Sequence, residues 1–382
     1  MSTQDIKLAA IADAIREKEG SAALIPANTF ADRILALPAG VQNPDAVLPA
    51  AATQEEQLAR IADAIRAKED SGGVIPANKF AERIAALEVI KTGLDWKLST
   101  LPASVNLHSI TFGDGKFVSV AYKSSSVMYS TDAITWQRTN VPKTGDWNAI
   151  AYGGGKFLIV GYRATGFTDG KNYGAVYSTD GLTWTMSTNP NTGDWSSIAY
   201  GDGKFVVTGN KSYMSYTSNG INWTSTLKVL PSSNYWKVAF GNGKFVTVPN
   251  GAKGAYSSNG INWTQMSMPL SANYSGGGIA FGDGRFVAVA YNSNHVAYSD
   301  DGINWTASTL PQSAYWGSIC YGNGLFVAIA RGGGTTAAFS KDGVSWEPTE
   351  LPSSQDWCDV VYGNGKFAVV SYGSDEIAYA AA

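Results

Sequence analysis

Aromatic side chains next to carboxylates recur where one sequence repeat ends and the next begins. Five of these connections read NVPKTGDW, STNPNTGDW, KVLPSSNYW, TLPQSAYW and ELPSSQDW. Flat aromatic rings stack on the C–H faces of sugars, while polar side chains hydrogen-bond to the hydroxyl groups. The pattern predicts a carbohydrate-binding surface. Its candidate residues are Trp147, Trp195, Tyr235, Trp236, Tyr315, Trp316, Trp357, Asp146, Asp194 and Asp356.

The tryptophans of these connections have a second interpretation. A large ring that recurs at one place in the repeat also suits packing between neighbouring repeats, in which case it never reaches solvent. The series is interrupted at the equivalent points near Leu107 and Gly276, where no Trp is present. The sequence leaves both interpretations open.

One repeat carries an insertion that adds three candidate ligand residues. Phe117 and Tyr129 are 12 positions apart, whereas the equivalent Phe157 and Tyr177 are 20 apart. The additional segment, RATGFTDGKNYG at 163–174, is either a recognition loop or a tolerated surface excursion. Its candidate binding residues are Arg163, Lys171 and Tyr173.

Residues suited to catalysis or metal binding are sparse. The two histidines, His108 and His295, lie in no metal-ligand spacing and beside no nucleophile motif. The two cysteines, Cys320 and Cys358, occupy different places in their repeats, and we interpret them as buried free thiols. We therefore predict no catalytic residue, no metal and no cofactor, and a protein that is not an enzyme.

The elements that must position the candidate residues are short β-strands. A Gly-x-Gly turn followed by Phe occurs seven times with a period of about forty residues, starting at 113, 153, 201, 241, 282, 322 and 363. One copy contains four β-rich runs, WGSICYG, LFVAIAR, TAAFSKDG and VSWEPTELP. Four strands in about forty residues predict a β-propeller blade. We expect Gly113, Gly153 and their equivalents to close two-residue hairpins.

The two ends of this region complement each other. The last repeat, GNGKFAVVSYGSDEIAYAAA, has three strands and no Trp strand, while residues 92–100, TGLDWKLST, match the missing phrase with Trp96. We therefore predict a mainly β fold with a seven-bladed propeller over residues 91–382, whose last blade is closed by the strand at 92–100. Closure of the ring removes free sheet edges.

The phrase from Tyr177 to Trp184, YSTDGLTW, resembles the Asp-box, or bacterial neuraminidase repeat, of β-propeller proteins. It departs from that box because Asp180 and Gly181 are adjacent and because Asn replaces Asp at 219 and 259. The resemblance implies a structural turn between the third and fourth strands, away from the ligand face.

The same resemblance raises a sialidase-like glycoside hydrolase as an alternative. By resemblance, that site needs three arginines around a carboxylate, a Tyr nucleophile paired with Glu, and a further acidic residue. No pair of carboxylates in the propeller sequence is convincing for glycoside hydrolysis. The available arginines and glutamates of the propeller are Arg138, Arg163, Arg285, Arg331, Glu347, Glu350 and Glu376.

The first ninety residues contain a duplicated unit of a different kind. LAAIADAIREKEGSAALIPANTFADRILAL at 8–37 recurs at 58–87 with few changes, and its apolar residues fall at helical spacing. The pattern predicts two α-helical hairpin repeats, at 1–38 and 54–90, separated by a Pro- and Ala-rich linker at 39–53. The units resemble short repeats of phage tail-appendage proteins, which implies attachment to a tail or to neighbouring chains.

These observations favour a non-enzymatic binding protein. We expect a phage tail receptor-binding protein in the virion that recognises host-surface carbohydrate, with residues 1–90 contacting other tail proteins; a structural tail scaffold that binds another protein is the alternative. A formal net charge of −3 excludes a basic nucleic-acid binder, and no apolar run is long enough to insert in a membrane. Two units too small to bury their own apolar faces also allow a homo-oligomer.

Overall fold

The computed structural model describes residues 24–26, 74–76, 94–162, 173–187, 195–209, 214–226, 237–274 and 276–381. The chain divides into two compact units, Met1–Thr92 and Gly93–Ala382. In the first unit, the described segments are β1 (Leu24–Pro26) and β2 (Val74–Pro76). These two strands pair antiparallel, with Ile25 opposite Ile75.

The predicted fold class is wrong in its helical part, because the described residues contain strands and no helix. The strands β1 and β2 occupy the connections of the two predicted hairpins, at Leu-Ile-Pro and Val-Ile-Pro. A residue that precedes proline is restricted to extended conformations, and β-branched residues favour strands, so these tripeptides pair as a small sheet. The other positions of the predicted hairpins, and the linker at 39–53, lie outside the described residues.

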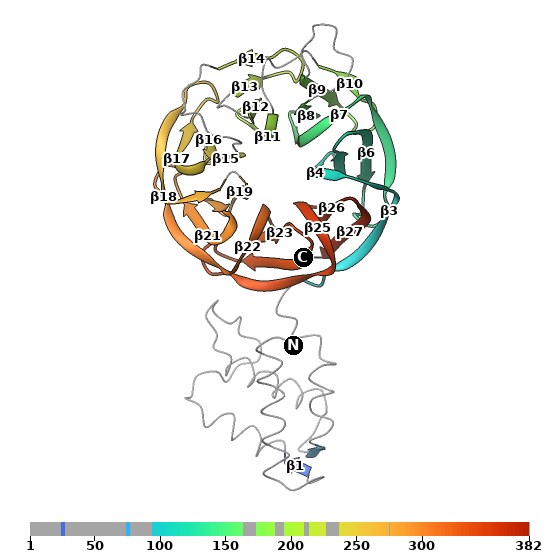
Figure 1. Ribbon diagram of the computed structural model, residues 1–382, viewed down its shortest axis with the longest axis vertical. Helices are drawn as coiled ribbons and strands as arrows, with labels where there is room; N and C mark the ends of the chain where they lie inside the picture. Colours follow the sequence, from blue (N-terminus) through green and yellow to red (C-terminus); the bar gives the residue numbers. More distant parts are fainter. Residues whose placement is uncertain are drawn as a thin grey trace. The chain divides into compact units, whose positions relative to one another are not determined.

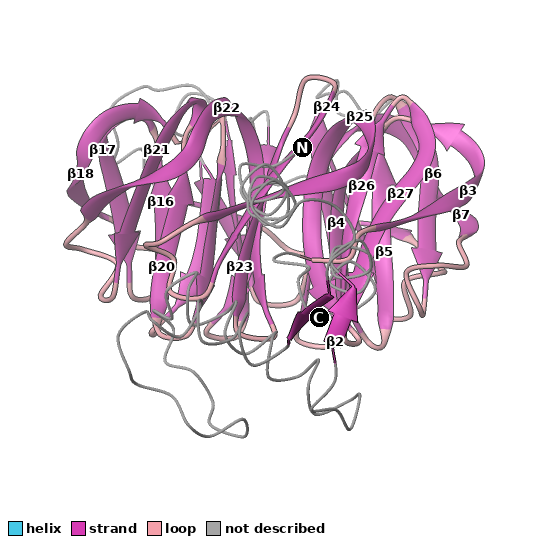
Figure 2. Ribbon diagram, turned by 90° about the horizontal axis from the view of Figure 1, so that it is seen from below, coloured by secondary structure: helices cyan, strands magenta, loops and turns pink. Residues whose placement is uncertain are grey.

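The second unit is a closed ring of antiparallel strands, which Figure 1 shows from one face. The strands form seven four-stranded blades, each beginning with a strand at the centre of the ring. In the edge-on view of Figure 2 the strands of neighbouring blades stand side by side around the ring. The ring is therefore a β-propeller.

The first three blades run from the centre outwards in chain order. The first blade contains β4 (Leu107–Gly113), β5 (Lys116–Ala121), β6 (Ser124–Ser130) and the first part of β7 (Gln137–Gly153). The second contains the second part of β7, β8 (Lys156–Tyr162), β9 (Tyr173–Ser178) and β10 (Thr185–Met186). The third contains β11 (Trp195–Gly201), β12 (Lys204–Gly209), β13 (Met214–Thr217) and β14 (Thr224–Ser225).

The next three blades repeat this order. The fourth blade contains β15 (Lys237–Gly241), β16 (Lys244–Val248), β17 (Asn250–Ser257) and β18 (Thr264–Asn273). The fifth contains β19 (Gly278–Gly282), β20 (Arg285–Val289), β21 (Tyr291–Ser299) and the first part of β22 (Thr306–Gly322). The sixth contains the second part of β22, β23 (Leu325–Ala330), β24 (Gly334–Ser340) and the first part of β25 (Glu347–Gly363).

The seventh blade joins the two ends of the unit. It contains the second part of β25, then β26 (Lys366–Tyr372) and β27 (Ser374–Ala381), and its outer strand is β3 (Lys97–Val105). In the antiparallel pair of β27 and β3, Tyr379 lies opposite Lys97 and Glu376 opposite Thr100. The predicted closure is seen in this register, but the closing strand runs over Lys97–Val105 and not over 92–100, and the preceding Trp96 is buried against this blade.

The hairpins between the first and second strands are two-residue turns, but the glycines predicted to close them are one position too early. Gly113 pairs with Lys116 in the ladder, and the turn residues between them are Asp114 and Gly115, with φ of 46° and 70°. Positive φ at both positions is the signature of a type I′ turn.

Gly113 has a packing role. A Cβ atom on this residue would lie 2.0 Å from Cγ of Tyr152 in the next blade, so only glycine lets that ring pack on the strand end. The equivalent contact of the last blade is made by Gly363 with Phe112 of the first. The recurrent glycines therefore set how closely the blades approach one another.

The turns between the third and fourth strands are held by a short polar side chain. In the first blade, a carboxylate oxygen of Asp132 accepts hydrogen bonds from the backbone N–H groups of Ile134 and Thr135, at 2.8 and 2.7 Å. These hydrogen bonds lower the pKa of Asp132, and the bond from Thr135 has the largest effect. Asn259 accepts the equivalent bonds from Ile261 and Asn262, so either Asp or Asn can hold this turn.

The hydrophobic core lies between neighbouring blades, as in the cluster that joins Val118 and Val120 of the first blade with Ile150 and Phe157 of the second. In β5, five consecutive residues from Phe117 to Ala121 are buried, because this second strand packs between neighbouring blades on both faces.

Among the described residues, no helix is long and apolar enough to span a membrane.

Candidate ligand-binding site

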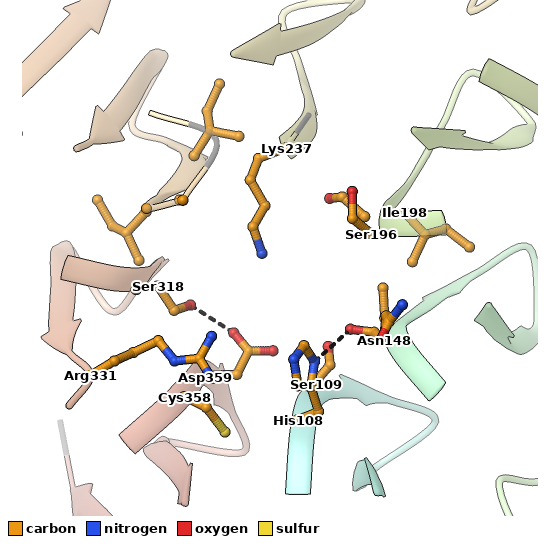
Figure 3. A pocket seen from close by; sticks show the side chains of 18 of the residues that line it. His108, Ser109, Asn148, Ser196, Ile198, Lys237, Ser318, Arg331, Cys358 and Asp359 are labelled. Atoms are coloured by element: carbon orange, nitrogen blue, oxygen red, sulfur yellow. Dashed lines mark hydrogen bonds between the residues drawn. The ribbon is translucent and has the colours of Figure 1, made fainter. Parts of the chain in front are cut away.

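A polar pocket of about 640 Å³ lies at the centre of the propeller, where the innermost strands of the blades begin. This volume is in the range of about 300–1,000 Å³ that is typical of small-molecule sites. Side chains from several blades converge there, among them His108, Asn148, Lys237 and Asp359 (Figure 3).

The pocket residues occupy equivalent positions in the repeats. In five of the inner strands the pairing register shifts one residue after the strand's first large apolar residue, as between Trp147 and Ala149. Such a bulge places two residues opposite one on the partner strand and re-aims a side chain. The residues at the bulge all line the pocket, and they are His108, Asn148, Ser196, Gly317 and Cys358.

The fourth blade departs from this pattern. From Trp236 to the strand-end Gly241 it has one residue fewer than the stretch from Trp147 to Gly153. Its inner strand β15 starts in regular register at Lys237, opposite Val248. Lys237 therefore occupies the position held in other blades by small or acidic residues, which are Ser109, Ala149, Ser197, Gly278, Ser318 and Asp359.

Aliphatic side chains lie one residue further along each inner strand. Ile110, Ile150 and Ile198 line the pocket and are almost completely buried. The same position holds Val238, Ile279 and Ile319 in the next three blades. A polar ring of side chains thus lies beside an apolar ring, an arrangement that suits a ligand with both hydroxyl groups and C–H faces.

His108 is held as a neutral imidazole. Its Nδ1 lies 3.1 Å from the carbonyl oxygen of Asn148, which can only accept, so Nδ1 carries the proton and Nε2 keeps its lone pair. Burial, followed by the positive charge of Arg331, lowers the pKa of His108 to about 4. At neutral pH the pocket therefore contains a hydrogen-bond acceptor at Nε2.

Side chains around the pocket also link one blade to the next. The amide of Asn148 donates to the carbonyl oxygen of Trp195 at 2.9 Å, and Ser197 Oγ accepts from the N–H of Val238 at 3.2 Å. On the other side of the ring, Ser318 Oγ donates to Oδ1 of Asp359 at 2.6 Å, and Oδ2 of Asp359 accepts from the N–H of Ile110 at 2.9 Å. The same residues therefore line the pocket and hold the inner strands together.

Lys237 and Arg331 are the basic side chains of the pocket lining, and Asp146 and Asp359 are the acidic ones. Arg331 follows β23, and its backbone N–H donates to the carbonyl oxygen of Tyr315 at 2.8 Å. Its side chain crosses Gly317, where a Cβ atom would lie 2.3 Å from Arg331 Cγ. Gly317 thus makes room for the guanidinium group to reach the pocket.

Tyrosine side chains lie close to the pocket residues. Tyr122 lines the pocket and its ring centroid is 5.9 Å from that of His108. Tyr315 is 47% exposed and lies against Tyr291, with ring centroids 5.1 Å apart. The hydrogen bond between the backbones of Tyr315 and Arg331 places the two residues side by side. The exposed ring of Tyr315 therefore offers an apolar surface next to the basic side of the pocket.

The pocket lining shows no conventional metal site. Within the described segments, no three His, Cys, Asp or Glu side chains lie close enough together to hold a metal ion. Cys358 is a free thiol whose Sγ donates toward the carbonyl oxygens of Leu107 and Val370, and burial raises its pKa. It is therefore a thiol and not a thiolate at neutral pH.

The described tryptophans of these connections do not form the predicted solvent-exposed surface. The side chains of Trp147, Trp195, Trp316 and Trp357 are 0–1% exposed, and each belongs to a hydrophobic cluster between strands. Of the two interpretations, packing between repeats fits this burial, and stacking on a sugar does not. At these four described positions the ring fills space at the start of the inner strand.

The other predicted site residues are placed as follows. Asp146 is buried and lines the pocket. Tyr315 is exposed, and Asp356 accepts a hydrogen bond from the N–H of Gly332 at 3.0 Å and lies 3.8 Å from Arg331 Nε. Tyr173 begins β9, and its side chain is outside the description. The residues outside the described ranges are Arg163, Lys171, Asp194, Tyr235 and Trp236.

Sequence reasoning missed His108, Asn148, Lys237 and Arg331 as residues of the pocket. A signal was present for the first three, because the position after the large apolar residue differs from blade to blade while its neighbours recur. Arg331 had no such signal, since it reaches the pocket from the connection between the second and third strands. The sequence singled out the recurring aromatic residues, and recurrence here marks packing.

Comparison with known proteins shows the fold. Virginiamycin B lyase from Staphylococcus aureus superposes with a TM-score of 0.65 at 12% identity, over 76% of this chain and 100% of that chain. YCF48 bound to D1 peptide gives 0.59 at 16% identity, over 76% and 98%. A computationally designed protein gives 0.53 at 10% identity, over 75% and 100%. No family model and no curated protein matches the sequence.

Proposed function

We propose that the propeller is a carbohydrate-binding module whose ligand occupies the central pocket. The observation that carries this proposal is the pocket's lining, in which polar side chains such as Asn148 and Ser196 lie beside a ring of aliphatic ones. Sugars present hydroxyl groups and C–H faces together, so both halves of the lining have a partner. The exposed ring of Tyr315 extends this surface beyond the pocket.

The pocket differs in character from the surface that the sequence first suggested. Its recognition groups are short polar side chains on rigid strands, so little conformational entropy is lost when they bind. His108 offers an acceptor at Nε2, and the side chain of Asn148 is fixed by its bond to the next blade. A preformed polar site of this kind favours a specific ligand over a general adhesive surface.

The test is binding of the full-length protein to an array of bacterial surface glycans, followed by calorimetry with the strongest ligand. Ser196→Trp places a large ring in the pocket and is expected to abolish binding. Ser218→Trp is the matched control, because Ser218 is exposed in a turn and absent from the pocket lining. Equal binding by both variants, each with an unchanged melting temperature, would place the ligand elsewhere and sink the proposal.

A phage tail is the proposed setting, with host-surface glycan as receptor and residues 1–90 as the part that contacts other tail proteins. The support is the resemblance of the duplicated IADAIR segments to repeats of tail-appendage proteins. Antibodies against the propeller should label the distal tail of purified particles in electron micrographs. Labelling of host cells alone, with bare particles, would contradict this setting.

A second candidate function is acid–base catalysis on the bound ligand. The observation in its favour is the neutral His108 in a polar pocket, with an unprotonated Nε2. An enzyme, virginiamycin B lyase, shares the fold. Prolonged incubation of the best glycan with the protein, followed by mass spectrometry, distinguishes the two functions. Intact glycan supports binding alone, whereas product that disappears with His108→Asn would establish catalysis.

A further inference from the structure

In the described part of the chain, the side chain of Lys237 makes no hydrogen bond to a neighbouring blade, unlike several other polar residues of the pocket. Hydrogen bonds from pocket residues link the first blade to the second, the second to the third, and the third to the fourth. Others link the sixth to the seventh and the seventh to the first. After Lys237 comes the fifth blade, whose pocket residues Gly276, Gly277 and Gly278 have no side chain to continue the series.

The ammonium group of Lys237 extends into the pocket from the start of β15 (Figure 3). In the described ranges of the chain, no hydrogen-bond acceptor and no carboxylate oxygen within 4 Å is paired with its Nζ, although Asp359 attracts it from further away. Removal from water lowers the pKa of Lys237, and the positive charge of Arg331 adds to that effect. The side chain is half-buried in the pocket and has no close partner among the described residues.

The acidic group that attracts Lys237 is already engaged. Both oxygens of Asp359 accept hydrogen bonds, from Ser318 Oγ and from the N–H of Ile110. Arg331 is a second cation on the same pocket, and its contact in the described residues is Asp356, 3.8 Å away at the edge. Two basic groups thus line one cavity, in which the carboxylate of Asp359 is already bonded within the fold and Asp146 is a further acidic residue.

We propose, on the premise that the propeller binds carbohydrate, that its ligand is an acidic sugar whose carboxylate is held by Lys237 and Arg331. A carboxylate accepts charge-assisted hydrogen bonds from both an ammonium and a guanidinium group. The acceptor at His108 Nε2 and the amide of Asn148 are then available to the sugar's hydroxyl groups.

The experiment uses the full-length protein and a glycan array in which each uronic-acid-containing glycan is paired with its carboxyl-reduced counterpart. The acidic member of a pair is expected to bind at least about tenfold more tightly, since bonds to charged groups are the stronger class. Lys237→Gln and Arg331→Gln should each remove most of this preference. Lys341→Gln is the matched control, because Lys341 is exposed and outside the pocket.

A second measurement uses the wild-type protein, so poor folding of a variant does not affect it. Binding of a carboxylate next to Lys237 stabilises its protonated form, so at alkaline pH the wild-type protein should take up protons with the acidic glycan. Calorimetry in two buffers of different ionisation enthalpy reports this uptake, which the carboxyl-reduced glycan should not produce. Proton uptake that is equal for the two glycans would overturn the inference.

The outcomes separate the inference from the proposed function. If acidic and reduced glycans bind equally and Lys237→Gln changes nothing, the propeller is a carbohydrate binder and the inference is wrong. If no glycan binds but a peptide with a free C-terminal carboxylate does so through Lys237, the carbohydrate function and the acidic-sugar inference both fail.

Discussion

The backbone N–H of Ile110 donates to Oδ2 of Asp359 over 2.9 Å, although 249 residues separate the two along the chain. Ile110 lies in the first inner strand and Asp359 in the last, so the bond joins the two ends of the ring at the pocket. Asp359→Ala should lower the free energy of unfolding by about 1–3 kcal/mol, because it leaves buried donors on Ile110 and Ser318 unpaired. Urea denaturation measures the change, and Asp375→Ala, at an exposed position, is the control. Equal stability of the two variants would show that the bond contributes nothing.

Closure of the ring by β3 predicts a large effect at Trp96. Its side chain is 8% exposed and packs near Phe367, with ring centroids 6.5 Å apart. Trp96→Ala should cost about 3–5 kcal/mol, as is usual for a large buried aromatic residue. Leu98→Ala, two residues away and 43% exposed, should cost less than about 0.5 kcal/mol.

The same closure makes a prediction for truncations, with thermal unfolding as the measurement. Deletion of residues 92–100 removes the start of the closing strand and should destabilise the whole propeller. Deletion of residues 1–88 should leave the propeller folded. Truncations with equal melting temperatures would contradict closure by β3.

The contact between Gly363 and Phe112 makes a further prediction. A Cβ atom on Gly363 would lie 2.1 Å from Cγ of Phe112, so Gly363→Ala should destabilise the ring by at least about 1–3 kcal/mol through overpacking. Gly334→Ala is the control, since a Cβ atom there meets nothing within 4 Å. If the clash is the cause, Gly363→Ala should cost less in a Phe112→Ala background, and additive losses in a double-mutant cycle would refute it.

His108 predicts a pH dependence of stability. Its pKa is about 4 in the folded protein, against 6.5 for an ordinary histidine side chain. The unfolded chain therefore binds more protons between these values, and stability should fall as the pH drops from about 6.5 to about 4. The difference in unfolding free energy between wild type and His108→Asn should vary over this window. The same substitution at His295, outside the pocket lining, is the control, and an unchanged difference would contradict the assigned burial of His108.

The blades could be predicted from the sequence because their determinants are local and repeated. The Asp-Gly and Asn-Gly pairs specify two-residue turns, and alternating apolar residues specify the strands. Trp96 could be assigned to the seventh blade because the same phrase recurs in the other repeats. The helical hairpins were predicted from apolar spacing and from the proline that marks the connection, and at these connections the tripeptides Leu24–Pro26 and Val74–Pro76 pair as strands, which a β-branched residue before proline favours.

The pocket could not be predicted in the same way, since it depends on how strands from distant repeats meet. Trp147 and Asn148 are adjacent in sequence, yet one is buried in the blade and the other lines the pocket, because a bulge separates them. Asp146 was selected for its position beside Trp147, and it does line the pocket, whereas its neighbour does not. Arg331 enters from a connection that the repeat pattern did not single out.

The pocket-lining positions that follow the recurrent apolar residues affect how such a protein evolves. Substitutions at Ser196 alter the chemistry of the cavity, while the aromatic and glycine contacts between blades remain as they are. A duplicated blade can therefore acquire a new ligand preference without repacking, and a library randomised at these few codons should yield folded rings with different specificities.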